Sequence, residues 1–245
     1  MTIAAGSFPA AGGRSAGSLW VATGRAGGYS TPPFDGFNLA DYLGDDPDAV
    51  ARNLALAASL IGVDRDHLAI LEGVHGARVA LVDTGGTIPG VDGLVSTTPD
   101  LALMARAADC VPVVMADPDR GVVAAVHCGW RGLVAGIVGA AIGVMREVGA
   151  GRISAVIGPS ICAQCYPVPH ARVDEVLAGV SPAAAVAACP PDCGSFIDVG
   201  AGVRQQLMDE SVVVEQISMC TAESPELFSY RRDGLTGRQS MIVRL

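Results

Sequence analysis

The spacing of apolar residues along the chain predicts a series of buried strands interleaved with several helices. Strands are expected where short apolar runs are bounded by Gly, Pro or Asp. These runs cover residues 19–24, 68–82, 92–98, 102–117, 121–128, 152–160 and 240–245. Helices are expected at 45–63, 131–148, 173–180 and 201–210, the first of them opened by Asp46 as a cap and Pro47 in the first turn.

The connections between these elements indicate the fold class. The strand at 121–128 runs through GWRG into the helix at 131–148, and 152–160 returns as a strand, which is a strand–helix–strand unit. Internal repeats and a clear linker are both absent from the sequence. We therefore predict an α+β fold, a mixed β-sheet core flanked by helices, with one catalytic domain over 19–245. The Gly-, Ala- and Ser-rich residues 1–18 are predicted to form a flexible N-terminal segment.

Composition narrows the classes of function. Half of the 245 residues are hydrophobic, which is ample for a large core, and the formal net charge is -9. This charge opposes contact with nucleic acid or an anionic membrane, because both are bound through basic side chains. All 16 basic residues are Arg, so Schiff-base lysines, pyridoxal-phosphate lysines and P-loop lysines are excluded. We expect a small-molecule substrate and a monomer or small homo-oligomer.

The chain also lacks the signals of export. Its first residues have neither the basic nor the apolar region of a signal peptide, and the longest apolar run, Leu133 to Met145, is shorter than the roughly 20 residues that span a bilayer. Seven cysteines without an export signal favour reduced thiols over disulfides. We predict a cytoplasmic protein with no membrane contact.

Three candidate metal ligands stand at the ends of predicted strands. His75 follows an apolar run, Cys110 opens DCVPVVM and His127 closes GVVAAVH. Two imidazoles and one thiolate suit zinc and leave a fourth position open for water or substrate, as in catalytic zinc sites. A lone histidine at a strand end is more often an ordinary buried or surface residue. Spacing alone therefore does not bring the three together.

A series of motifs supplies the missing argument. They are FNL (37–39), VHG (74–76), DGLV (92–95), ADCVPV (108–113), VHCGWRG (126–132), IGPSICAQCY (157–166) and CTAESPELFSYRRDGLTGRQ (220–239). In this order they resemble the YfiH-like family, also called laccase-domain or multicopper polyphenol oxidoreductase proteins, whose fold is similar to that of cysteine-hydrolase toxins. The resemblance implies that His75, Cys110 and His127 bind the metal and form the catalytic centre. The chain departs from the family at Gly73, usually Gln, and at Cys128, usually Ala.

The resemblance also implies an activity in purine nucleoside metabolism. It implies phosphorolysis of adenosine, inosine and methylthioadenosine and deamination of adenosine, with a purine nucleoside and phosphate as partners. Zinc is the expected cofactor, with copper as a substitute. Substrate contacts are expected from Asn38, Arg131, Tyr230 and Arg231, and Arg131 is the best anion contact because it stands beside a helix N-terminus. Ordinary surface ion pairs are an equal alternative for Arg231 and for Arg232.

Other functions stay open. Cys110 with His127 or His75 would form a metal-free hydrolase, such as an amidase that edits peptidoglycan precursors. A copper-dependent polyphenol oxidase is disfavoured, because four histidines are too few for a multicopper centre. The usual deaminase signature, H-x-E with P-C-x-x-C, is absent, so a deaminase activity needs a different scaffold. A binding role without catalysis is the last alternative.

The remaining cysteines and Asp109 are harder to interpret. Cys162 and Cys165, with Cys189 and Cys193, have the pairwise spacing of a closed zinc site, although packing is the more common role. Cys220, with no near partner in sequence, is interpreted as packing. Cys128 is predicted to pack, facing away from the metal because neighbouring strand residues point to opposite sides. By the same reasoning Asp109 faces away from the metal and at most supports a ligand.

Overall fold

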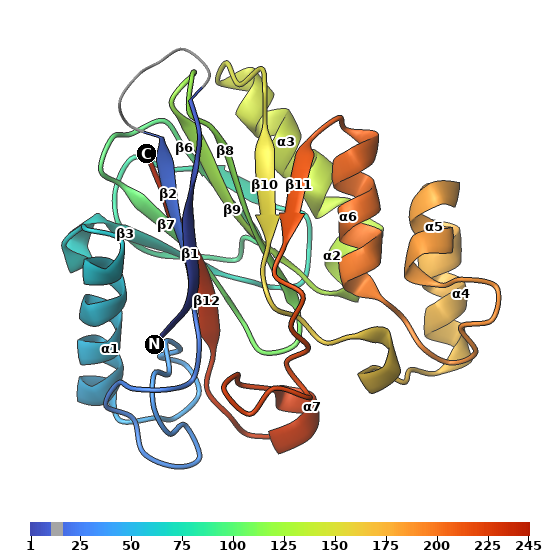
Figure 1. The fold of residues 1–245 in the computed structure, drawn as a ribbon, viewed down its shortest axis with the longest axis horizontal. Helices are drawn as coiled ribbons and strands as arrows, with labels where there is room; N and C mark the ends of the chain where they lie inside the picture. The colour runs from blue at the N-terminus through green and yellow to red at the C-terminus, as the bar shows by residue number, and fades with distance from the viewer. Residues whose placement is uncertain (11–16) are drawn as a thin grey trace.

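Two six-stranded sheets pack face to face in the computed structural model, which describes residues 1–10 and 17–245, and helices cover their outer sides (Figure 1). The first sheet has the order β1 (Thr2–Phe8), β2 (Ser18–Thr23), β12 (Gln239–Arg244), β7 (Ala102–Ala107), β3 (Leu68–Glu72) and β5 (Gly86–Pro89). The second has the order β11 (Val213–Gln216), β10 (Ser154–Ile157), β8 (Val111–Asp117), β9 (Val122–Cys128), β6 (Gly93–Ser96) and β4 (Val79–Leu81).

The helices lie on opposite sides of the paired sheets (Figure 1). Helix α1 (Pro47–Leu60) covers the first sheet. The other side carries α2 (Trp130–Ala135), α3 (Ile137–Glu147), α4 (His170–Gly179), α5 (Pro182–Ala188) and α6 (Val199–Asp209). Two single-turn elements, η1 (Arg65–His67) and η2 (Ala163–Cys165), and the short α7 (Tyr230–Asp233) complete the described elements. The predicted α+β fold is confirmed.

Three hydrophobic clusters separate these layers. In β7, Leu103 and Ala105 point into the cluster between the two sheets, while Ala102 and Met104 point into the cluster under α1. The third cluster joins the second sheet to the helices on its outer side. Both faces of the central strands are therefore buried, which explains why their sequences are continuous apolar runs rather than alternating ones.

Each of two predicted strands is divided in the structure into two strands, and the two strands belong to different sheets. The run at 68–82 divides into β3 and β4, and the run at 102–117 divides into β7 and β8. The apolar pattern gave no boundary in 102–117, because both faces of β7 and β8 are buried, and none in 68–82, because β4 is a partly exposed strand of only three residues. The crossings contain His75 with φ of 61° and Asp109 with φ of 91°, left-handed conformations that turn the chain from one sheet to the other. Both crossings lie at the candidate site.

The prediction of a flexible segment at residues 1–18 is wrong for its first part. Thr2–Phe8 form β1, which pairs antiparallel with β2 at the edge of the first sheet. Its Ala, Gly and Ser content hides a strand whose only fully buried side chain is Phe8. Gly6 lies against the Trp20 ring, where an added Cβ would come within 2.8 Å of the indole. Residues 11–16 of that segment lie outside the described residues.

The helical predictions are largely confirmed. The helix expected at 131–148 is interrupted at Gly136, whose φ of 77° ends α2 and begins α3. The β9–α2–α3–β10 unit is a crossover that skips one position, because β8 lies between β9 and β10. Among the described residues, no helix combines the length and apolar character that crossing a bilayer requires.

The N-terminal cap of α1 gives a test of the fold. The Asp46 carboxylate accepts a hydrogen bond from the Asp48 amide at 3.0 Å. We expect Asp46→Ala to lower the free energy of unfolding by about 1 kcal/mol, because that helical amide loses its partner. Asp46→Asn is the control, since Asn caps equally well. Urea unfolding measures both, and equal losses for Ala and Asn would contradict the capping role.

Candidate metal centre and its cavity

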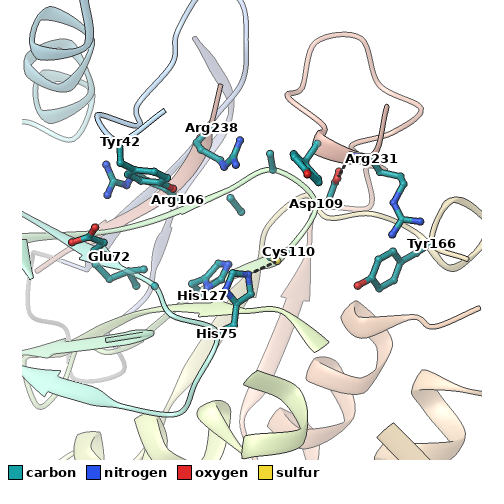
Figure 2. A pocket seen from close by; sticks show the side chains of 15 residues that line it. Tyr42, Glu72, His75, Arg106, Asp109, Cys110, His127, Tyr166, Arg231 and Arg238 are labelled. Carbon is teal, nitrogen blue, oxygen red and sulfur yellow. Dashed lines mark hydrogen bonds between the residues drawn. The ribbon is translucent and has the colours of Figure 1, made fainter. Parts of the chain in front are cut away.

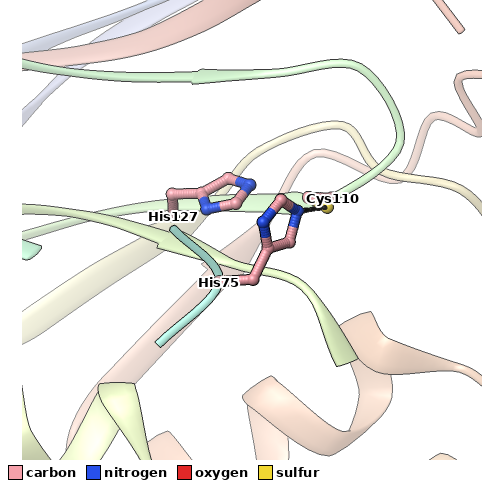
Figure 3. A group of neighbouring side chains, drawn as sticks. All are labelled: His75, Cys110 and His127. Carbon is pink, nitrogen blue, oxygen red and sulfur yellow. Dashed lines mark hydrogen bonds between the residues drawn. The ribbon is translucent and has the colours of Figure 1, made fainter. Parts of the chain in front are cut away.

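His75, Cys110 and His127 meet at one point, as the sequence predicts. Their donor atoms lie within 4.8 Å of one another. The Cys110 sulfur is 3.8 Å from Nε2 of His75, and the two imidazole rings stand edge to face with centroids 4.9 Å apart (Figure 3). A tetrahedral zinc ion with Zn–N of about 2.0 Å and Zn–S of about 2.3 Å separates such a nitrogen and sulfur by roughly 3.6 Å. The three donors therefore fit one ion.

The fold supplies the ligands from three different chain segments. His127 is near the end of β9 and pairs with Pro112 of β8, which is two residues after Cys110. The strand pairing therefore brings His127 close to Cys110. His75 comes from the crossing after β3. Gly129 lies beneath them, where an added Cβ would be 2.9 Å from the His75 ring and 3.1 Å from the Cys110 sulfur. This close approach explains the glycine in the HCGWRG segment.

Asp92 connects both histidine ligands, and the sequence analysis missed it. Its carboxylate lies 3.0 Å from Nδ1 of His127, and it accepts the amides of Val74, His75 and Gly76 at 3.2, 3.0 and 2.7 Å. The first contact leaves Nε2 of His127 for a metal, the arrangement typical of zinc-bound histidines. The three amides hold the turn that carries His75. The DGLV motif, which begins with Asp92, was the available signal.

Burial and charge give the cysteine–histidine pair unusual proton affinities. Burial by itself would raise the pKa of Cys110, but the charge and hydrogen bond of His127, with a smaller effect of His75, lower that pKa to about 6. For His127 the direction is opposite: burial by itself would lower its pKa, but Cys110 and Asp92 raise that pKa to about 9. Burial opposes ionisation of Asp92 too, yet hydrogen bonds with His127 and Gly76 leave its pKa below the ordinary value. Without a metal, the pair is therefore a thiolate beside an imidazolium.

Cys128 lies on the other side of its strand, as predicted. It is fully buried among the side chains between the second sheet and the helices. Burial raises the pKa of its thiol well above the usual value, and the Cys110 and Asp92 charges add to that effect. A neutral thiol in this position packs as a small apolar group.

Asp109 fastens a distant segment to the site. Its carboxylate accepts hydrogen bonds from Thr221 and Ser229 hydroxyls at 2.6 and 2.7 Å and from the Arg231 amide at 2.6 Å. Its backbone carbonyl accepts the Ile161 amide at 2.9 Å. Asp109 therefore supports the site, as the sequence suggested, but by holding loops rather than by contacting a ligand.

The three ligands open into a cavity of about 520 Å³, within the usual range for small-molecule sites (Figure 2). It lies where β3, β7 and β9 end and β8 begins, at one end of the space between the sheets. The lining residues are Tyr42, Leu71, Glu72, Gly73, His75, Arg106, Ala107, Ala108, Asp109, Cys110, His127, Tyr166, Tyr230, Arg231 and Arg238.

Two of the four expected substrate contacts line this cavity. Tyr230 and Arg231 do so, and the Arg231 guanidinium lies 4.8 Å from the Tyr166 ring and donates to the Pro167 carbonyl at 3.0 Å. Arg232, in contrast, pairs with the neighbouring Asp233.

The structure does not place Asn38 and Arg131 in the cavity wall. Asn38 is fully buried, and its side-chain oxygen accepts the Arg238 amide at 3.0 Å, so it positions a cavity residue instead of touching substrate. Arg131 is exposed and lies against the Trp130 ring at 4.7 Å. Its place at a helix start was correct, but its side chain is not among the residues that line the cavity.

Arg106 and Arg238 are cavity residues that the sequence analysis missed. Arg106 is only 4% exposed and donates to the Leu39 carbonyl and the Asp41 carboxylate. Its Nε and Nη2 atoms have no partner within the described part of the chain, and the Tyr42 ring lies 5.0 Å from the guanidinium. Arg106 interrupts an otherwise apolar strand sequence. A charged residue at such a position is the signal that could have indicated a side chain facing a cavity.

The cysteine pairs do not form the four-cysteine site that was one interpretation of their spacing. Instead, the structure brings Cys162 and Cys165 together with Cys220, their sulfurs within 4.8 Å of one another. Cys220, interpreted as packing because it has no near partner in sequence, therefore has two cysteine neighbours in space. Its partners lie 55 or more positions away, so spacing gave no signal. Cys189 is buried beside Cys193, and burial raises its pKa to about 11.

The link through Asp92 gives a prediction for metal affinity. We expect Asp92→Asn to weaken zinc binding at His75, Cys110 and His127 by about 10–100-fold, because the amide cannot accept from the ring and the three turn amides as the carboxylate does. Competition with a chromophoric chelator measures the affinity. Asp117→Asn is the control, since that carboxylate accepts the Gly151 and Arg152 amides elsewhere. An unchanged affinity in Asp92→Asn would contradict the proposed link.

The ionisation of Cys110 gives a second prediction. In metal-free protein, alkylation of Cys110 should increase with pH around a midpoint of about 6, because the thiolate is the reactive form. His127→Ala should move this midpoint upward, since the imidazolium is the main group that favours the thiolate. Peptide mass spectrometry after timed iodoacetamide labelling measures both. A wild-type midpoint above 8 would show that the pair is not ionised.

Comparisons with known proteins place the chain in a family. A family model described as multi-copper polyphenol oxidoreductase laccase matches residues 19–245. A Mycobacterium tuberculosis protein named purine nucleoside phosphorylase is 45% identical over 230 residues, which cover 91% of this chain and 90% of that one. Adenosine deaminase RL5, from an unknown prokaryotic organism, is 34% identical over 82% of this chain and 84% of its own. The crystal structure of the Bacillus licheniformis hypothetical protein YfiH has a TM-score of 0.85 at 28% identity, covering 93% and 92% of the two chains. The chain therefore belongs to the multi-copper polyphenol oxidoreductase laccase family, the YfiH-like family that its motifs predicted.

Proposed function

We propose that this protein is a zinc-dependent purine nucleoside phosphorylase that also deaminates adenosine. One observation carries the proposal: the His75, Cys110 and His127 ligand set and three arginines open into the same cavity. Relatives named purine nucleoside phosphorylase and adenosine deaminase support the substrate class. The cavity has the volume of a small-molecule site, and its wall carries both arginines that suit an anion and tyrosine rings that suit an aromatic base.

Phosphate is assigned to the arginines of the cavity wall. Arg106, Arg231 and Arg238 line the cavity, and planar guanidinium groups match phosphate oxygens with paired hydrogen bonds. These residues replace Arg131 as the anion contacts. They also place three cationic groups in the cavity, beside the carboxylates of Glu72 and Asp109, in a chain whose formal net charge is -9, and these cations are available to an anionic co-substrate.

The aromatic base is assigned to the tyrosines. Tyr42 and Tyr166 lie on opposite sides of the view into the cavity, each against an arginine (Figure 2). Tyr230 adds a third ring to the wall. Flat aromatic faces of this kind bind a purine through stacking and apolar contact.

The reaction needs positioned groups more than it needs a nucleophile from the protein. A phosphate oxygen forms a bond to C1′ of the ribose while the bond from C1′ to N9 breaks. The purine leaves with the electron pair and takes up a proton. The arginines hold the phosphate and offset its charge, and Asp92 fixes the orientation of His127. When bound, the zinc ion supplies Lewis-acid polarisation in the same cavity.

The donor set favours zinc over a multicopper cluster. Of the four histidines, only His75 and His127 reach the site, while His67 belongs to η1 and His170 lies 3.1 Å from the Ser195 hydroxyl. Two imidazoles and one thiolate complete three of four positions on a single ion, whereas a cluster of several coppers needs further ligands for each.

Product analysis tests the proposal. Wild-type protein with adenosine and phosphate should yield adenine and ribose 1-phosphate, with inosine as the deamination product, and a chelator should abolish turnover. Arg238→Gln should raise the KM for phosphate by roughly 10–100-fold, the cost of about 1.5–3 kcal/mol for a lost charged hydrogen bond. Arg131→Gln is the matched control and should leave that KM unchanged. Absence of products, or full activity in Cys110→Ser, would refute the proposal.

A thiol hydrolase is the second candidate, and one observation favours it. Cys110 would be the nucleophile, His127 the base and Asp92 the carboxylate that orients His127. The pKa of Cys110 is lowered to about 6, which favours its nucleophilic thiolate form. A metal-free amidase would use this arrangement, and zinc would inhibit it. The hydrolase hypothesis predicts that an amide substrate is hydrolysed faster in the presence of a chelator and that alkylation of Cys110 abolishes this hydrolysis. Both results together would favour the hydrolase over the phosphorylase.

A further inference from the structure

Three cysteines gather outside the cavity. Cys162 and Cys165 come from the loop after β10, with Cys165 ending the single turn η2, and Cys220 comes from the segment after β11. Their sulfurs lie within 4.8 Å of one another, and each side chain is partly exposed. Backbone contacts hold the two segments side by side. Ser160 and Cys220 form a parallel β-bridge, and the Thr221 amide donates a hydrogen bond to the Ser160 carbonyl.

The backbone around Cys220 favours a thiolate. The Cys162 amide donates to the Cys220 sulfur at 3.3 Å. Burial would raise the pKa of Cys220, but this hydrogen bond, the Cys162 thiol and the amides of Ala222 and Glu223 lower it. Metals bind the thiolate, so Cys220 is prepared as a ligand. Burial and the neighbouring thiols raise the pKa of Cys162 and that of Cys165, the latter to about 12, so a metal has to displace their protons.

We propose that Cys162, Cys165 and Cys220 form a second metal site, for zinc, with water in the fourth position. A zinc ion with Zn–S of about 2.3 Å places its sulfurs roughly 3.8 Å apart, so a sulfur cluster within 4.8 Å needs only small side-chain rotations to bind. A disulfide instead requires two sulfurs at about 2.05 Å and leaves the third unused. The Cys-x-x-Cys spacing is also that of zinc ligands on a tight turn.

One cation lies beside such a site. Three thiolates and one zinc ion carry a net charge of -1, and the Arg232 guanidinium, which pairs first with Asp233, also interacts electrostatically with Cys220. Arg232 also donates to the Thr221 and Ser224 carbonyls at 2.9 and 2.8 Å, so the cation is fixed beside the loop.

The site would act as a clamp on the cavity wall. Cys165 precedes Tyr166, and Thr221, next to Cys220, donates to Asp109, which also holds the Arg231 amide. A metal that joins Cys165 to Cys220 therefore fixes the two segments that present Tyr166 and Arg231 to the cavity. Its role is positional, since its ligands are absent from the cavity lining.

Cobalt titration of metal-free, reduced protein tests this second site. Thiolate ligands give Co2+ intense sulfur-to-metal absorption that grows with their number, so the one-thiolate and three-thiolate sites are distinguishable. Wild type should bind two equivalents, and the triple variant Cys162→Ser, Cys165→Ser, Cys220→Ser should bind one and lose most of that absorption. The double variant Cys189→Ser, Cys193→Ser is the matched control and should still bind two.

A measurement on wild-type protein keeps the test independent of variant folding. Zn2+ should protect Cys162, Cys165 and Cys220 from alkylation, as mapped by peptide mass spectrometry, while Cys193 stays reactive. A wild-type absorption no stronger than that of the triple variant, two equivalents in the triple variant, or a disulfide among the three cysteines would overturn the proposal. Nucleoside cleavage is not a readout in either experiment, so failure here is distinct from failure of the proposed activity.

Discussion

The Asp92 carboxylate is the constraint on which the candidate centre depends. It binds the ring of one histidine ligand and the backbone amides of the turn that carries the other. The main chain of Asp92 also accepts the His127 amide at 2.8 Å, so the two residues are linked twice. A buried carboxylate is costly unless such partners satisfy it. The same contacts that keep Asp92 ionised therefore fix both imidazoles for metal binding.

A second carboxylate organises the opposite wall of the cavity. Asp109 stands at the crossing from β7 to β8, and its hydrogen bonds bring residues 221–231 to the site. Asn38 has a similar role for Arg238. The cavity is thus assembled from segments that are remote in sequence, each tied by a polar side chain that is buried, as Asn38 is, or half-buried, as Asp109 is. The proposed cysteine clamp would reinforce one of these connections from outside.

The sequence predicted the fold class and the meeting of His75, Cys110 and His127, and the reasons for its failures are physical. Apolar periodicity located buried strands but could not show where 102–117 passes between sheets, because both faces of β7 and β8 are covered, or where 68–82 does, because β4 is only three residues long. Motif position suggested Asn38 and Arg131 as substrate contacts, yet burial turns one inward and leaves the other on the surface. Asp92 and the Cys220 cluster depend on contacts between distant segments, which spacing along one chain does not encode.

The shared ion at His75, Cys110 and His127 is the central claim, and zinc K-edge X-ray absorption tests it most directly. The measurement is made on the Cys162→Ser, Cys165→Ser, Cys220→Ser variant, so that a single site contributes. The account predicts stoichiometric zinc with two imidazole nitrogens and one sulfur in its first shell. A variant that holds no zinc while cleaving nucleosides at the wild-type rate, or a zinc shell without sulfur, would contradict it.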